Sequence, residues 1–360
     1  MANRYAVIMA GGAGKRLWPA SRANRPKQLI RLVDGKRLLD LAVERLGELF
    51  EPSRVLIITS AAYREAIRQS LPQLPPENVI GEPEGRDTAN AIALAAELIA
   101  ARQADATMAV FTADHIIRPE GDFRRCVEKA MQTAEGEPDA LVTFGIRPSS
   151  PHTGLGYIHT APARPDGIRP VLGFKEKPDH HTARMYVESG QYFWNSGMFV
   201  WKVETILATL RELLPASAHA LAEVGAAARA GRPIAPLLER IYPALARISI
   251  DYAVMEKAQN VLMVELACQW LDVGSWPSLE TVIPLDADGN AVVAARAAVI
   301  DSNRNILYSD DDEHLLAVVG MDDCIIVHAR DATLVCNKSD AQRLKELVDL
   351  IARQYGQRYV

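Results

Sequence analysis

The residues best suited to chemistry stand near the start of the chain, where three glycines and five basic residues follow a short apolar run. The run Tyr5–Ala10 predicts a buried strand, and Gly11, Gly12 and Gly14 come directly after it. Because glycine has no Cβ, backbone N–H groups in such a turn can converge on an anion. The basic residues are Lys15, Arg16, Arg22, Arg25 and Lys27. The segment therefore predicts a phosphate-binding loop.

Two better-known glycine motifs differ from this loop. The P-loop of NTPases needs a glycine where Met9 stands and a hydroxyl residue where Arg16 stands. The dinucleotide fingerprint needs a third glycine where Leu17 stands. Neither a P-loop enzyme nor a Rossmann dehydrogenase is predicted, and an ordinary glycine turn with solvated bases stays the alternative.

Two aspartates are candidates for a metal site. Asp114 follows the apolar run Met108–Thr112, at the carboxyl end of a predicted core strand. Asp272 follows the strand predicted at Val261–Leu266 and precedes a glycine turn. Mg²⁺ prefers one or two carboxylates together with substrate phosphates and water. The pair predicts a Mg²⁺ site, although a helix or turn cap explains either residue alone equally well.

Two further segments offer groups for a phosphorylated sugar. Glu176 and Lys177 follow a predicted strand, where a carboxylate could hold a hydroxyl and an ammonium a phosphate. A solvated Lys-Pro turn is the alternative there. Asn195-Ser-Gly197 interrupts an apolar strand, which suits either hydroxyl recognition or a β-bulge.

Composition limits the class of protein. The chain has 360 residues, 49% of them hydrophobic, which favours one large domain with a smaller one. A net charge of −5, with cations gathered in one loop, favours a small anionic ligand over nucleic acid. The four cysteines lack a metal-ligand spacing, and no apolar run is long enough for a membrane span. We expect a cytoplasmic protein with free thiols that binds neither nucleic acid nor a membrane.

Short apolar runs alternate with amphipathic stretches over the first part of the chain. This alternation predicts a parallel sheet covered by helices, with ligands beyond the carboxyl ends of its strands. The strands are predicted at Tyr5–Ala10, Val55–Thr59, Met108–Thr112 and Leu141–Gly145, and the helices around Leu39–Phe50, Ala61–Leu71, Ala89–Ala101 and Phe123–Ala134.

The pattern changes after Pro284, where short Val/Ile runs are separated by Asp, Asn and Gly. These runs predict an all-β segment, followed by a helix that carries Leu344, Leu347, Val348 and Ile351 on one stripe. A segment this small cannot bury both faces of its strands. We therefore expect it to pack against the rest of the chain or against a second subunit.

Taken together, eight segments in order over residues 5–280 resemble the sugar-1-phosphate nucleotidylyltransferases, in their bacterial mannose-1-phosphate guanylyltransferase branch. The segments are the glycine loop with Arg16 and Pro26-Lys27, Glu82-Pro-Glu-Gly-Arg-Asp-Thr88, Phe111-Thr-Ala-Asp-His115, Thr153-Gly-Leu-Gly-Tyr157, Glu176-Lys-Pro178, Phe193-Trp-Asn-Ser-Gly-Met198, Ser249-Ile-Asp-Tyr252 and Leu271-Asp-Val-Gly-Ser-Trp276.

The resemblance implies a fold and a reaction. It implies an α/β fold, with a Rossmann-like mixed-sheet nucleotidyltransferase domain of the glycosyltransferase-A-like type over residues 1–284. A small left-handed β-helix-like domain with a C-terminal helix, serving dimerisation, is implied for residues 285–360, and the isomerase domain of longer members is expected to be absent. The implied reaction transfers GMP from GTP to α-D-mannose 1-phosphate, with Mg²⁺, and gives GDP-mannose and pyrophosphate.

The resemblance also implies roles for individual residues. The expected phosphate ligands are Gly11, Gly12 and Gly14, with Arg16 and Lys27 as catalytic cations and Asp114 and Asp272 as ligands of Mg²⁺. The expected guanine-facing residues are Glu82, Arg86 and Thr88, and the expected sugar-phosphate residues are Gly145, Glu176, Lys177 and Asn195. A carboxylate at Glu82 could accept from both guanine N1–H and the exocyclic amine, donors that adenine does not present.

Three positions depart from the family pattern and leave alternatives open. Leu155 stands where Tyr is usual, Asp87 where Asn is usual and Asn90 where Pro is usual. These positions touch the sugar and base pockets, so a GTP-dependent enzyme for another sugar 1-phosphate, such as a heptose, is one alternative. A catalytically silent regulatory homologue that binds nucleotide sugars is another.

Overall fold

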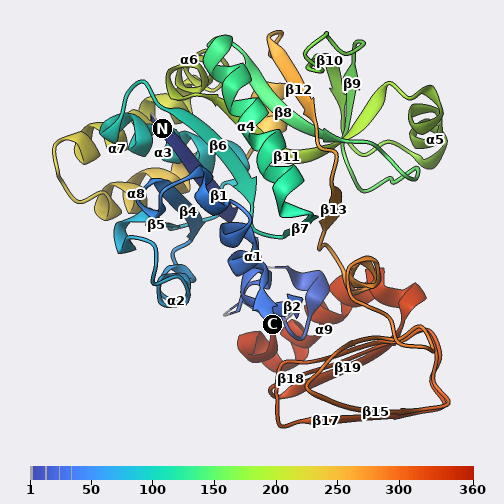
Figure 1. Ribbon diagram of the computed structural model, residues 1–360. Helices are drawn as coiled ribbons and strands as arrows, with labels where there is room; N and C mark the ends of the chain where they lie inside the picture. Colours follow the sequence, from blue (N-terminus) through green and yellow to red (C-terminus); the bar gives the residue numbers. More distant parts are fainter. Residues whose placement is uncertain (1–2, 13, 24, 34) are drawn as a thin grey trace. The chain divides into compact units, whose positions relative to one another are not determined.

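The computed structural model describes residues 3–12, 14–23, 25–33 and 35–360 (Figure 1). The chain forms two compact units, and neither is continuous in sequence. The first unit comprises Met1–Met9, Arg45–Thr112 and Ile117–Gln269, and the second comprises Ala10–Glu44, Ala113–Ile116 and Trp270–Val360. The domain boundary expected at residue 284 stays a prediction, separate from this division into two units.

Among the described residues, the first unit is built on a nine-stranded sheet (Figure 1). In spatial order the strands are β5 (Val79–Glu82), β4 (Val55–Ser60), β1 (Arg4–Ala10), β6 (Thr107–Thr112), β11 (Tyr192–Lys202), β8 (Leu141–Ile146), β12 (Val261–Glu265), β10 (Arg169–Lys175) and β9 (Tyr157–Thr160). β1 pairs parallel with β6, and β8 pairs parallel with β12, but β11 runs antiparallel to both β6 and β8. The sheet is therefore mixed, which confirms the predicted fold class.

Helices cover both faces of this sheet. α4 (Glu120–Gly136) packs on β6, β8, β11 and β12, and its Phe123 meets Phe111 of β6 edge-on. α3 (Asp87–Arg102), α6 (Val203–Leu213) and α7 (Pro215–Arg229) pack on one another in a core that contains Val110. Val110 and Phe111 are consecutive strand residues, so they point to opposite faces of the sheet. α2 (Arg64–Ser70), α5 (His180–Ser189) and α8 (Ala235–Ile241) also belong to this unit.

The second unit contains several short elements around the glycine loop. They are β2 (Arg31–Val33), β3 (Lys36–Arg37), α1 (Leu38–Glu44), the first half of β7 (His115–Arg118) and most of β13 (Gln269–Asp272). β7 and β13 pair with each other. The remainder of the unit is the C-terminal segment, with β14 (Ala291–Val293), β15 (Arg296–Ile300), β16 (Ile306–Ser309), β17 (Leu315–Val319), β18 (Cys324–Ala329), β19 (Ala332–Asn337) and α9 (Leu344–Tyr355).

The C-terminal strands form the successive turns of a β-helix-like coil. β14, β16 and β18 pair in parallel, and so do β15 and β17, because each turn of the coil lays its strands beside those of the next. Two fully buried asparagines line one corner, where Asn305 donates its Nδ2 to Oδ1 of Asn290 at 3.0 Å. The all-β prediction for this segment is confirmed.

The coil buries one of its faces within its own unit. Ile306 and Ile325 pack in one core with Leu17, Trp18 and Ile30, which flank or follow the glycine loop. Leu344 and Val348 of α9 are buried in the same core, and Leu347 and Ile351 are partly buried against it. The structure therefore shows the C-terminal segment packed against the rest of the chain, which was the first of its two expected partners.

Two expectations from composition concern thiols and membranes. Cys126, Cys268, Cys324 and Cys336 are free. Within the described ranges, no helix has both the length and the apolar character needed to cross a bilayer.

Candidate active site

Gly14 determines the shape of the predicted phosphate-binding loop. Its φ is +67°, and a Cβ added there would lie 2.6 Å from Cβ of Lys27 and 2.9 Å from Oγ of Ser21. Both the backbone conformation and the close approach therefore require glycine. Gly11 and Gly12 are exposed, so their backbone is accessible to a ligand, whereas residue 13 lies outside the described residues.

Three of the five predicted loop cations are already paired with acidic residues of the C-terminal segment. The pairs are Lys15–Asp349, Arg22–Asp331 and Arg25–Asp310. The acids of the tail therefore supply counter-charges to three of the bases that the sequence gathers around the glycine loop. Arg16 is exposed and has no ion-pair partner in the described parts of the chain. Arg16 and Lys27 are the two loop cations that acids of the tail do not neutralise.

Lys27 forms an ion pair with Asp114 beneath the glycine loop. Nζ of Lys27 contacts Oδ2 of Asp114, and only 14% and 21% of the two side chains are exposed. Burial by itself would raise the pKa of Asp114, but Lys27 and His115 lower it to about 2. Burial lowers the pKa of Lys27, yet Asp114 and Asp272 raise it above its usual value. Both groups are therefore charged at neutral pH.

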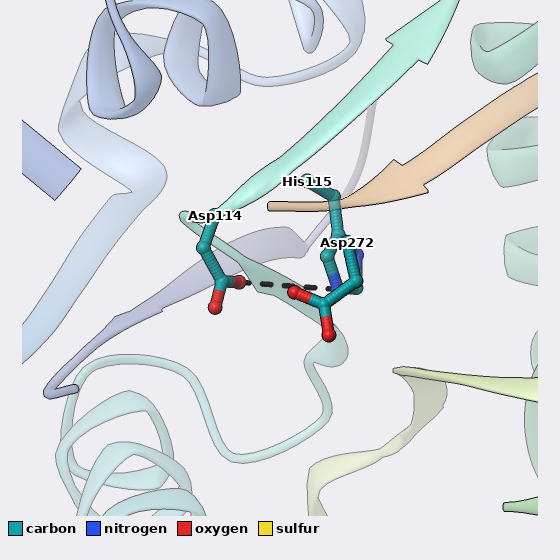
Figure 2. A group of neighbouring side chains, drawn as sticks. All are labelled: Asp114, His115 and Asp272. Carbon is teal, nitrogen blue, oxygen red and sulfur yellow. Dashed lines mark ion pairs between the residues drawn. The ribbon is translucent and has the colours of Figure 1, made fainter. Parts of the chain in front are cut away.

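Asp114, His115 and Asp272 form a compact cluster in the second unit, as Figure 2 shows. Each residue has a potential ligand atom within 4.8 Å of those of the others. The backbone fixes this arrangement, since the N–H of Val273 donates to the carbonyl of Asp114 at 3.1 Å. Oδ1 of Asp272 is buried and has no hydrogen-bond partner among the described residues.

The hydrogen bond of His115 shows that its ring differs from the two carboxylates in what it can offer to a cation. Nε1 of Trp270 donates to Nδ1 of His115 at 3.1 Å. This bond assigns the ring proton to Nε2, which lies 3.9 Å from Oδ1 of Asp114. On the side of Asp114, His115 therefore presents an N–H and not a lone pair that a cation could use. Sequence reasoning gave it no role, although it directly follows Asp114 and is almost fully buried.

The structure adds a strand that the sequence analysis did not predict at Asp272. Asp272 is the last residue of this strand, β13, which pairs with β7 directly after Asp114. The strand near Val261–Leu266 is β12 of the large sheet, and β13 is a further strand between it and the glycine turn. The predicted pairing of Asp114 with Asp272 is nevertheless the one that the cluster shows.

The predicted sugar-phosphate residues lie in the first unit. Glu176 follows β10, and its Oε1 is 2.8 Å from Nζ of Lys177, which has a φ of +40°. A Cβ added at Gly156 would lie 2.7 Å from Oε2 of Glu176 and 3.6 Å from Cβ of Asn195. Glu176 and Asn195 therefore flank the same stretch of backbone, and Asn195 also sits at an irregularity in the pairing of β11 with β8.

Gly145 has a packing role that the sequence did not reveal. It lies opposite Asn195 in the sheet, and its carbonyl accepts from the N–H of Leu266 at 2.8 Å. A Cβ at this position would collide with Sδ of Met263 and approach Cβ of Phe193 to 2.9 Å. Glycine is therefore required here by the core of the sheet.

Glu82 ends β5 and is almost entirely buried. Burial raises the pKa of its carboxyl to about 7, against the lowering effect of a hydrogen bond with Tyr242. Its Oε1 has no hydrogen-bond partner in the described part of the chain. A buried carboxylate oxygen without a donor is costly, so this group is available for an N–H donor from a ligand.

Arg86 and Thr88 are tied to a neighbouring segment of the first unit. The Arg86 guanidinium contacts Glu84 at 2.8 Å and donates to the carbonyl of Pro243. Oγ1 of Thr88 accepts from the N–H of Ile250 at 2.9 Å. These contacts are structural, and the expected role of the two residues in nucleotide binding stays a prediction.

The candidate residues thus fall into two groups. The second unit holds Gly11, Gly12, Gly14, Arg16, Lys27, Asp114 and Asp272, and the first unit holds Glu82, Arg86, Thr88, Gly145, Glu176, Lys177 and Asn195. The structure brings Lys27, Asp114 and Asp272 together in the one, and Glu176 with Asn195 in the other.

Both parts of the sequence match known protein families. Residues 5–289 match the family described as nucleotidyl transferase, and residues 295–351 match the mannose phosphate isomerase/GMP-like β-helix domain. A mannose-1-phosphate guanylyltransferase of Klebsiella pneumoniae is 38% identical over 98% of this chain and 75% of its own length. The xanthan biosynthesis protein XanB of Xanthomonas campestris pv. campestris is 36% identical over 98% of this chain and 74% of its own.

A solved structure from Thermus thermophilus, described as a mannose-1-phosphate geranyltransferase, superimposes with a TM-score of 0.86 at 33% identity. The superposition covers 97% of this chain and 99% of that one. The likeness therefore extends over the catalytic segment and the β-helix-like tail alike.

Proposed function

Because this chain belongs to the nucleotidyl transferase family, in the branch of the mannose-1-phosphate guanylyltransferases, we propose that it transfers GMP from GTP to α-D-mannose 1-phosphate. The products are GDP-mannose and pyrophosphate. The observation that carries the proposal is the glycine loop folded over Lys27, whose ammonium is paired with a carboxylate of the Asp114–Asp272 cluster.

The reaction proposed is a single in-line displacement at the α-phosphorus of GTP. A phosphate oxygen of the sugar phosphate forms a bond to that phosphorus, and the bond to the bridging oxygen of pyrophosphate breaks. The attacking oxygen is already anionic, so no residue is needed as a general base. Lys27 and Arg16 act by position and charge, because preorganised cations stabilise the charge that develops in the transition state.

The carboxylates of Asp114 and Asp272 fit Mg²⁺. Hard oxygen ligands suit this ion, and the buried Oδ1 of Asp272 has no donor within the described residues. Nδ1 of His115 already accepts from Trp270 and its Nε2 faces Asp114 with a proton, so the imidazole does not compete with the two carboxylates as a ligand. Mg²⁺ held by the two aspartates would neutralise charge on the nucleotide phosphates.

Replacing Asp272 by asparagine is expected to raise the Mg²⁺ concentration needed for half-maximal activity by at least about 10-fold. The change removes a negative ligand and leaves the backbone of β13 in place. Asp114→Asn should behave alike. Activity measured against Mg²⁺, with GTP saturating, tests this, and EDTA should abolish turnover.

Asp312→Asn is the matched control, because Asp312 is exposed on a turn of the same unit and lies outside the cluster. If Asp272→Asn titrates with Mg²⁺ as the wild type does, Asp272 is a turn residue and the proposed metal site is wrong.

The proposed substrates can be tested in one assay of pyrophosphate release. Four nucleoside triphosphates are paired with the 1-phosphates of mannose, glucose and a heptose, and initial rates are compared. GTP with mannose 1-phosphate should give the highest kcat/KM. A higher value with another sugar would redirect the substrate assignment, and no turnover with any pair would favour a regulatory homologue.

We also propose that the protein is a homodimer that uses the outer face of the β15–β17 sheet. Ile300 lies beside Val319 in this pairing, and Leu315 begins the same strand as Val319. These side chains are 60%, 67% and 56% exposed, respectively. Apolar side chains gathered on one exposed sheet face are typical of an interface.

The paired substitution Ile300→Lys with Val319→Lys should convert the dimer to a folded monomer in light scattering. Two charges on each copy oppose association, while the buried face of the coil is unchanged. Gln357→Lys, at an exposed site on the same unit, is the control. A double variant that stays dimeric would exclude this face.

Truncation before Pro284 would be a poorer test of the dimer face than these substitutions. The tail shares a core with Leu17, Trp18 and Ile30, so its removal would expose that core as well as any dimer face.

A further inference from the structure

A carboxyl group that the proposed reaction does not use lies behind Asn195. Asp251, in the segment Ser249-Ile-Asp-Tyr252, begins a π-helix over Asp251–Met255. We propose that Asp251 is a positioning residue, which holds the carboxamide of Asn195 in the orientation that receives a sugar hydroxyl. The inference rests on the proposed function and adds a determinant of its sugar affinity.

Two hydrogen bonds fix the carboxamide of Asn195. Its Nδ2 donates to Oδ1 of Asp251 at 2.8 Å, and its Oδ1 accepts from the N–H of Gly197 at 3.1 Å. A carboxylate accepts only, and a backbone N–H donates only, so the two ends of the amide cannot exchange places. One N–H and one lone pair of the carboxamide remain for a further partner.

Gly197 contributes to this arrangement through its backbone. Its φ is +65°, a conformation that glycine adopts without strain, at the irregularity in the pairing of β11 with β8. This turn brings its N–H back onto the side chain of Asn195 two residues earlier. The interruption of the strand is thus both a bulge and the means of holding Asn195.

The carboxamide of Asn195 lies near Glu176, the other residue expected to bind sugar hydroxyls. The backbone N–H of Asn195 donates to the carbonyl of Gly156 at 2.8 Å. Gly156 in turn lies against Oε2 of Glu176 so closely that a Cβ would be 2.7 Å away. Glu176 offers acceptors and Asn195 offers a donor with an acceptor, which is the combination that neighbouring sugar hydroxyls require.

The charge of Asp251 makes a purely structural role a poor explanation. Burial raises the pKa of its carboxyl to about 6, opposed by the bond from Asn195, with Glu176 adding to the rise. A partly buried carboxylate beside a second acid is costly, and an apolar pair of similar size would stabilise such a position at least as well. The arrangement is explained if the orientation of Asn195 is what the pair provides.

The test compares Asp251→Ala, Asn195→Ala, the double variant and Asp251→Asn. Asp251→Ala removes the acceptor, so KM for mannose 1-phosphate should rise about 10–100-fold, with KM for GTP unchanged, since misplacement of a binding group costs up to this much. Asp251→Asn keeps an acceptor oxygen in the same place and should restore most of the affinity. In the Asn195→Ala background, removing Asp251 should have little further effect.

Binding without turnover gives a second readout. Calorimetry should show that Asp251→Ala weakens binding of GDP-mannose and leaves binding of GDP unchanged. Glu256→Gln is the matched control, because Glu256 is an exposed acid near Asp251 that makes no bond to Asn195. If Asp251→Ala does not fold, Asp251→Leu fills the space without supplying an acceptor.

The outcomes separate this inference from the proposed function. A wild-type protein that neither turns over mannose 1-phosphate nor binds GDP-mannose contradicts the proposed function. An active wild type in which the two alanine substitutions have additive effects overturns the inference. The inference is also overturned if Asp251→Asn folds and binds as poorly as Asp251→Ala, because the charge itself, not the orientation of Asn195, would then be required.

Discussion

Replacing Lys27 by alanine is expected to lower kcat by about 10²–10³-fold, the usual cost of removing one preorganised charge from the transition state of group transfer. Lys27 lies against Gly14 of the glycine loop and pairs with Asp114, which places its charge at the proposed phosphate and metal site. Steady-state rates at saturating GTP and Mg²⁺ give the effect directly.

The Lys27→Ala substitution leaves Asp114 without its buried counter-charge. The thermal midpoint of the variant enzyme should therefore be measured together with its activity. Lys27→Met, which keeps the aliphatic stem, separates loss of charge from loss of packing. Lys15→Ala is the control within the loop, because Lys15 is exposed and paired with Asp349. A Lys27→Ala enzyme that keeps more than half of the wild-type turnover would refute the assignment.

Replacing Glu82 by glutamine is expected to narrow the preference for GTP over ATP in kcat/KM. A site built to hydrogen-bond a substrate group can reject an analogue that lacks it by about 10⁴–10⁵-fold, so part of that range is at stake. The buried Oε1 of Glu82, which has no donor in the described chain, is available for the N1–H or the amine of guanine.

The pH dependence of the preference follows from the same carboxyl group. Burial raises the pKa of Glu82 to about 7, and only the ionised form accepts from both guanine donors. The GTP:ATP ratio should therefore rise as the pH increases through 7 and fall as the pH decreases below it. Because the phosphates of GTP and ATP titrate alike, their ionisation cancels in the GTP:ATP ratio.

Tyr242→Phe is the matched control for Glu82→Gln. It removes the hydroxyl that bonds to Glu82 but keeps the carboxylate. If Glu82 only stabilises the fold, both variants will lower the thermal midpoint and neither will change the GTP:ATP ratio. An unchanged ratio in Glu82→Gln places guanine recognition elsewhere, without affecting the proposal for Lys27.

The local elements of this protein could be predicted from the sequence by itself. The strands at Tyr5–Ala10 and Met108–Thr112, the helix near Ala89–Ala101 and the all-β tail follow from hydrophobic periodicity and turn residues, which act over a few neighbouring positions. The glycine loop and Asp114 could be placed at strand ends for the same reason.

Tertiary structure decided which of those groups meet. Lys27 and Asp114, or Asn195 and Asp251, are far apart in the chain, and only pairing of strands and packing of loops brings them into contact. The tail supplies acids that neutralise Lys15, Arg22 and Arg25, which the count of basic residues near the glycines could not reveal. Asp272 reaches Asp114 because β13 pairs with β7, and such long-range pairing depends on the whole fold and not on local pattern.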